Sequence, residues 1–195
     1  MNAPVDTARR NRNRWMLVLV AAIFLGSAAL AGALRFSGWR PEGMKNHGEL
    51  LQPPADLRAM SPRLADGGTY AWRPVDRTWR ILVAPRPGCG EPCVALSRDL
   101  DKVWQLFGRE ADRVDVLWLG PAPPDAVRNE GWRELAPDAA LRAALPGVDA
   151  PASGPGAGGV PVYVVDPNGF VILRHAPGFD PAHLRQDMAR LLKLK

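Results

Sequence analysis

Residues 78–93 read TWRILVAPRPGCGEPC, and this stretch decides how the rest of the chain is interpreted. Thr78 to Ala84 is rich in β-branched and aromatic residues and is followed by Pro85 and Pro87, which predicts a central strand. From Cys93 to Phe107, apolar residues recur at steps of three and four, which predicts an amphipathic helix. A cysteine pair therefore stands between a strand and the start of a helix.

This position favours thiol chemistry, because backbone N–H groups and the helix dipole stabilise a thiolate at a helix N-terminus. We expect Cys89 to be the exposed, attacking thiol and Cys93 the sheltered, resolving thiol. On a regular helix, Cβ atoms four residues apart are about 5 to 6 Å from each other, and a disulfide needs about 3.5 to 4.5 Å. Gly88 and Gly90 would let the loop bring Cys89 inward. The same two thiolates could hold Cu(I), and a structural disulfide or two inert thiols are the remaining alternatives.

The rest of the chain predicts an α/β domain with a central sheet flanked by helices. An Asn-Gly pair within residues 166–169 indicates a hairpin turn, and residues 150–159, almost wholly Pro, Gly, Ala and Ser, predict a mobile loop. The tryptophans are expected to fill the core, at Trp72, Trp79, Trp104, Trp118 and Trp132. Further strands are predicted at 114–119, 160–165 and 170–173, and further helices at 137–145 and 181–194.

A membrane anchor is predicted near the N-terminus. Trp15 to Leu34 is twenty uncharged residues, the length that a helix needs to cross about 30 Å of hydrocarbon. A cleaved signal peptide ending near Ala29-Leu30-Ala31 is the alternative, although this apolar run exceeds the usual range of about 7 to 15 residues. The predicted organisation is a cytoplasmic N-terminus (1–14), a transmembrane anchor (15–36), a proline-rich linker (37–68) and a folded domain (69–195).

The distribution of charge indicates orientation and excludes some functions. Four arginines precede the span, which places the N-terminus in the cytoplasm and the domain in the periplasm, with a reversed anchor as the alternative. The first 36 residues carry five arginines and one aspartate, most of the formal net charge of +5. The rest is near neutral, which argues against nucleic-acid binding. The two cysteines also exclude a multi-disulfide scaffold and a four-cysteine zinc site.

The layout resembles the thioredoxin superfamily, and within it the membrane-anchored Sco-like proteins of cytochrome c oxidase assembly. The resemblance rests on Cys89-Gly-Glu-Pro-Cys93 after the first core strand, on Gly159-Val160-Pro161 before a later strand, and on the strand, turn, strand, helix ending. It implies that Pro161 follows a cis peptide bond and lies against the cysteine pair. It also implies thiol–disulfide exchange at a copper site of the oxidase, with an oxidase subunit or another assembly protein as partner.

Two alternatives follow from the same resemblance: a Cu(I) chaperone, and a noncatalytic assembly factor that uses the fold as a docking surface. Sco proteins supply a further copper ligand, a histidine, from the loop before the later strand, and residues 154–159 contain none. Copper would then bind the two thiolates alone, or recruit His175, His47 or an external group. We interpret His175 as a solvated residue at a strand end and His183 as a surface residue of the last helix.

Overall fold

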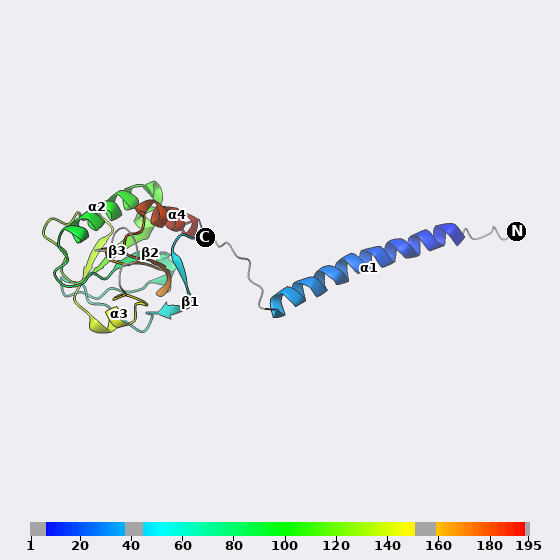
Figure 1. Cartoon of the computed structure of the whole chain (residues 1–195), viewed down its shortest axis with the longest axis horizontal. Coiled ribbons are helices and arrows are strands. Elements are labelled where there is room, and N and C mark those ends of the chain that lie inside the picture. Colours follow the sequence, from blue (N-terminus) through cyan, green and yellow to red (C-terminus); the bar gives the residue numbers. More distant parts are fainter. Residues whose placement is uncertain (1–6, 38–44, 151–158, 194–195) are drawn as a thin grey trace. The chain divides into compact units, whose positions relative to one another are not determined.

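The computed structural model describes residues 7–37, 45–150 and 159–193. The chain divides into two compact units, Met1–Lys45 and Asn46–Lys195 (Figure 1). The first unit holds helix α1, Thr7–Phe36. Its stretch Arg10–Phe36 is long and apolar enough to cross a membrane, because its 27 residues extend about 40 Å and bilayer hydrocarbon is about 30 Å thick. The predicted apolar helix is therefore confirmed as a candidate membrane span.

The second unit is built on a mixed sheet with the strand order β1-β6-β5-β2-β3-β4. Strand β2 pairs in parallel with β3, and β3 with β4, whereas β5, β6 and β1 add antiparallel to the other edge of β2. The α/β class predicted from the sequence is confirmed, with β2 at the centre. The strands are β1 (Glu49–Asp56), β2 (Trp79–Val83), β3 (Val114–Leu119), β4 (Trp132–Leu135), β5 (Val162–Val165) and β6 (Phe170–His175).

Helices cover both faces of this sheet. Helices α2 (Glu91–Gln105) and α4 (Pro181–Leu191) lie on one face and α3 (Ala139–Ala143) on the other, as Figure 1 shows. Strand β2 is buried on both faces, with Ile81 packed toward α2 and α4 and Leu82 packed toward α3. This explains why its sequence is a continuous apolar run rather than an alternating one. Two short 3-10 helices, η1 (Pro74–Asp76) and η2 (Gly108–Arg113), complete the described elements.

The tryptophans fill the core as predicted. Trp118 is fully buried and its ring stacks on that of Trp132, with the ring centroids 4.9 Å apart. Trp104 is half-buried, and its indole N–H donates to the carbonyl of Val114 at 2.9 Å. Trp72 and Trp79 are also buried. These side chains therefore serve packing on both faces of the sheet.

Strand β1 changes the predicted boundary of the folded domain. The sequence predicts a linker over 37–68, but Glu49–Asp56 pair with β6 and the folded unit begins at Asn46. Pro53 and Pro54 lie within β1, which is tolerated because β1 is an edge strand with a register shift between Leu50 and Ala55. Residues 38–44 of the predicted linker, and residues 151–158 of the predicted glycine-rich loop, lie outside the described residues.

Candidate redox site

The cysteine pair lies where the sequence places it, between β2 and α2. Helix α2 begins at Glu91 with Gly90 as its N-cap, so Cys93 occupies the first turn and Cys89 precedes the helix. The two sulfur atoms form a disulfide, with an S–S distance of 2.07 Å and Cα atoms 5.7 Å apart. Cys93 is fully buried, whereas Cys89 is partly exposed. The expected difference in exposure between the two sulfurs is therefore present.

The local sequence explains how the pair closes. Cys89 does not belong to the helix, so the spacing of a regular helix does not keep its Cβ away from that of Cys93. Gly88 adopts a positive φ of 76°, a conformation that favours glycine and turns the loop back toward α2. The N–H of Cys93 donates to the carbonyl of Gly90 at 3.0 Å. Both sulfurs thus lie at the positive end of the helix dipole.

The charged residues nearest the pair are engaged with other partners. The carboxylate of Glu91 lies 3.5 Å from the guanidinium of Arg98, which is two turns further along the same face of α2. Arg86 donates to the carbonyl of Asp149 at 2.7 Å. Glu91 and Arg86 carry opposite charges beside the cysteine pair, and each of them has a polar partner other than the cysteines.

Arg142 and Asp149, which the sequence did not single out, form hydrogen bonds that hold the loop before Cys89. Arg142, from α3, donates to the carbonyls of Ala84 and Pro85 at 2.9 and 2.8 Å. Its other terminal nitrogen donates to the Asp149 carboxylate at 2.7 Å, and this hydrogen bond lowers the pKa of Asp149. The sequence signal was an arginine on a short helix, because the carbonyls that it binds are main-chain atoms 58 and 57 residues away in the chain.

Pro161 lies in a cavity of about 360 Å³ that Cys89 also lines. Residue 161 and the cysteine loop therefore border one cavity. The prediction of a cis bond before Pro161 is wrong, because the cis peptide bond in the described residues is Gln52–Pro53. The trans isomer is the one that most X-Pro bonds adopt when nothing imposes the other.

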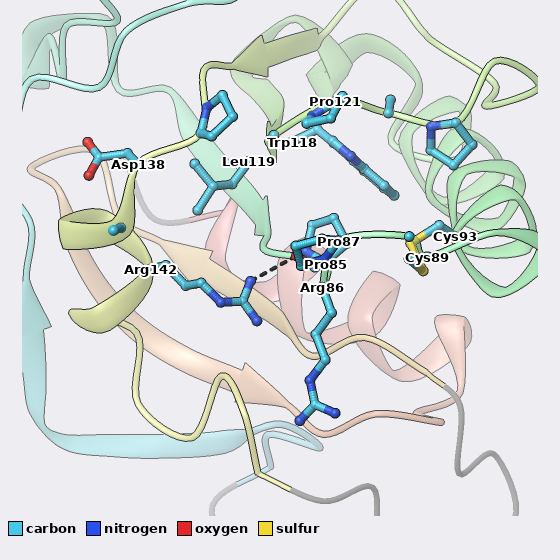
Figure 2. A pocket seen from close by; sticks show the side chains of 16 residues that line it. Pro85, Arg86, Pro87, Cys89, Cys93, Trp118, Leu119, Pro121, Asp138 and Arg142 are labelled. Carbon is cyan, nitrogen blue, oxygen red and sulfur yellow. Dashed lines mark hydrogen bonds between the residues drawn. A yellow bond between two sulfur atoms is a disulfide. The ribbon is translucent and has the colours of Figure 1, made fainter.

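A larger cavity of about 530 Å³ borders the same loop, and both cysteines are among the residues that line it. Figure 2 shows it between the cysteine loop, the end of β3 and the start of α3. Prolines supply much of its lining, so we call it the proline-lined cavity; they are Pro85, Pro87, Pro121, Pro123 and Pro137. The other cavity is called the Pro161 cavity.

The histidines do not join the cysteines. Neither cavity is lined by a histidine among the described residues, and over the same parts of the chain no group of three or more His, Cys, Asp or Glu could hold a metal ion. The interpretation of His175 as solvated is wrong: its side chain is 2% exposed because β6 carries it beneath α4, beside Asp187. Burial lowers its pKa to about 4. The ring of His183 stacks on that of His47, with centroids 4.0 Å apart.

Comparison with known proteins identifies the family. A family model described as the transmembrane-like, thioredoxin-like, C-terminal domain matches residues 79–195, more than half of the chain. The chain belongs to this thioredoxin-like family. Its disulfide, at the start of the helix that follows the central strand of the family domain, is thus part of a thioredoxin-like fold. No curated protein matches the sequence.

Solved structures share the thioredoxin-like fold at low sequence identity. A SCO1/SenC family lipoprotein from Bacillus anthracis is 15% identical and aligns over 73% of this chain and 99% of its own, with a TM-score of 0.50. BsSco, described as a Sco-family cytochrome c oxidase assembly protein with a disulfide switch, is 13% identical over 80% of this chain and 100% of its own, also at 0.50. Peroxiredoxin Q from Xanthomonas campestris is 14% identical over 76% and 97%, at 0.46. The likeness to the two Sco-family structures, at these identities, shows the fold.

Proposed function

We propose that this protein is a membrane-anchored thiol–disulfide oxidoreductase that acts through Cys89 and Cys93. One observation carries the proposal: the two sulfurs are bonded at a helix N-terminus, with Cys89 partly exposed between two cavities and Cys93 buried behind it. A structural disulfide has no need of an exposed sulfur or of cavities beside it. An exchange site needs both, because a partner must reach one sulfur and only one.

The reaction starts from the reduced pair. The Cys89 thiolate attacks one sulfur of the partner disulfide, forming a mixed disulfide while the partner's other sulfur leaves as a thiolate that takes up a proton. The Cys93 thiol gives up its proton and attacks the Cys89 sulfur, which releases the partner's second thiol. Two electrons pass from the protein's dithiol to the partner. The protein ends with the Cys89–Cys93 disulfide that the structure contains.

Pro161 is proposed to shape the surface on which the partner chain lies. It and Cys89 line the same cavity, and Gly159 and Val160 line it too. Proline has no backbone N–H and a fixed φ, so it presents a rigid, apolar edge to an incoming chain. Its role is therefore to position the partner beside Cys89, with no part in bond making.

The partner that we propose is a cysteine-bearing copper site of cytochrome c oxidase, whose thiols must be reduced before the metal enters. The support is the CxxxC spacing and the likeness in fold to Sco-family structures. The domain would act in the periplasm, anchored to the inner membrane by α1, because four arginines precede the apolar span. A subunit of the oxidase or another assembly protein would bind there.

The alternative is delivery of Cu(I) as cargo. Two thiolates held at one site fit a soft ion of low coordination number, and this observation favours the alternative. The cavities beside the pair offer no histidine among the described residues, so the thiolates would act as a two-coordinate set or with a ligand from the partner. The docking-surface alternative needs neither cysteine.

The test uses the full chain in detergent micelles, reduced with dithiothreitol and then freed of it. We expect it to reduce insulin disulfides stoichiometrically, with Cys89→Ser inactive and Cys93→Ser trapped as a mixed disulfide. Titration with Cu(I) against a competing chelator distinguishes thiol–disulfide exchange from copper delivery. Tight one-to-one binding of Cu(I) without insulin reduction would favour copper delivery. If the double Cys→Ser variant still supports oxidase assembly in cells, the docking role would replace both.

A further inference from the structure

The two cavities meet at the cysteine loop. The proline-lined cavity and the Pro161 cavity are both lined by Arg86, Pro87, Gly88 and Cys89, so both of them border this short segment. A partner chain whose cysteine reaches Cys89 passes over the loop. The residues next to that cysteine then come close to these cavities.

The wall of the proline-lined cavity is apolar and rigid. Besides its prolines, the end of β3 contributes Trp118 and Leu119, and Ala122 and Ala139 add methyl groups. Trp118 is fixed by its stack on Trp132, and each proline ring restricts the backbone beside it. A preformed apolar wall binds an apolar group at a low cost in ordering. At about 530 Å³ the cavity is large enough for an aromatic side chain, since pockets for small ligands span about 300 to 1,000 Å³.

The charged residues on this wall are already engaged. Among the described residues that line the cavity, the charged ones are Arg86, Asp138 and Arg142. Asp138 caps α3 by accepting from the N–H groups of Ala140 and Leu141. Arg142 binds the loop carbonyls and Asp149, and Figure 2 shows the Arg86 side chain directed away from Trp118 and the disulfide. An acidic or basic group entering the cavity would lose water and gain no free counter-charge.

We infer that the partner polypeptide carries a large apolar side chain, preferably aromatic, next to its reactive cysteine, and that this side chain enters the proline-lined cavity. The inference rests on the proposed thiol–disulfide exchange. It makes the cavity a specificity-determining site, which selects for an uncharged polypeptide segment over small charged thiols. Ala139 stands at the rim of this cavity as an exposed residue at the start of α3.

The test uses oxidised dimers of the peptide Gly-Ser-X-Cys-Z-Ser-Gly, reduced by the full chain in detergent under single-turnover conditions. Position X or Z is Phe, Ser, Asp or Lys, changed one at a time. We expect Phe on one side of the cysteine to raise the rate of mixed-disulfide formation about ten-fold over Ser at the same position, because its ring becomes buried. Asp and Lys at that position should react no faster than Ser.

Two matched variants locate the effect. Ala139→Leu places a larger side chain in the cavity, whereas Ala140→Leu adds the same group at the neighbouring exposed residue, which does not line it. The Phe preference should fall below about two-fold in Ala139→Leu and persist in Ala140→Leu, with the Ser peptide reacting equally in both. Equal rates for all peptides, or a preference that survives Ala139→Leu, would overturn the inference and leave the exchange activity standing. If no peptide disulfide is reduced by the wild type, the proposed function itself fails.

Discussion

The Nε2 atom of His175 lies 3.6 Å from a carboxylate oxygen of Asp187, and both side chains are almost completely buried. The same carboxylate accepts hydrogen bonds from the backbone N–H groups of His47 and Gly48, and Arg190 lies 3.3 Å from its other oxygen. One buried aspartate of α4 therefore ties the first residues of the folded unit to the end of β6. The chain enters the domain through a buried polar contact.

Stability should fall in mild acid because of His175. Burial lowers its pKa to about 4 in the folded protein, with Asp187 partly offsetting this effect, whereas the unfolded chain has the ordinary value near 6.5. Between these pH values the unfolded chain binds a proton at His175 that the folded chain does not bind. The contribution of neutral His175 to the free energy of unfolding is therefore complete above pH 6.5 and is lost as the pH falls toward 4. The free energy of unfolding should fall by up to about 3 kcal/mol over this range. Urea unfolding of wild type and His175→Gln at pH 7 and pH 4.5 measures it, and parallel pH profiles would contradict it.

Gly131→Ala should destabilise the sheet. A Cβ at this position would lie 2.5 Å from the carbonyl oxygen of Val114 and 2.6 Å from Nε1 of Trp104, the two atoms that form a hydrogen bond with each other. Neither can move freely, because Val114 begins β3 and Trp104 is packed against the core. We expect a loss of about 1 to 3 kcal/mol in the free energy of unfolding. A thermal midpoint equal to that of the wild type would show that the strand shifts without cost.

Arg142→Gln should loosen the loop before Cys89. The change removes charge-assisted hydrogen bonds to the carbonyls of Ala84 and Pro85, so the free energy of unfolding should fall by about 1.5 to 3 kcal/mol. Arg98→Gln is the control, because its ion pair with Glu91 is exposed and should contribute less than about 1 kcal/mol. Chemical denaturation of both variants makes the comparison. Equal losses of stability in the two variants would mean that the hydrogen bonds of Arg142 do not hold the loop.

The two reduced thiols should differ in their reaction with an alkylating reagent. Cys93 is 0% exposed and Cys89 is partly exposed, so iodoacetamide should modify Cys89 at least about ten times faster. Mass spectrometry of peptides from a brief reaction gives the ratio, and the same reaction in urea supplies the reference in which both thiols are accessible. Equal labelling of the folded protein would contradict the proposed roles of attacking and resolving thiol.

Local patterns were sufficient for the central strand, the two long helices and the position of the cysteines. Strand β2 was predictable because burial on both faces demands an uninterrupted apolar run, and α2 because its apolar residues follow the period of a helix. Edge strand β1 was not, because Pro53 and Pro54 are typical of loops and only the pairing with β6 makes them part of a strand. The short strand β4 was not predicted from the sequence either, because its backbone hydrogen bonds depend on its pairing with β3.

The sequence by itself determined that this chain carries a cysteine pair at a helix start and an apolar segment long enough to span a membrane, since both features depend on neighbours in the chain. Tertiary structure alone decided which groups surround the pair. The histidines gather around Asp187 instead of joining the cysteines, and prolines from three separate segments form one cavity wall beside them. Such contacts join residues far apart in the sequence, and only the packing of the whole sheet and its helices sets the distances between them.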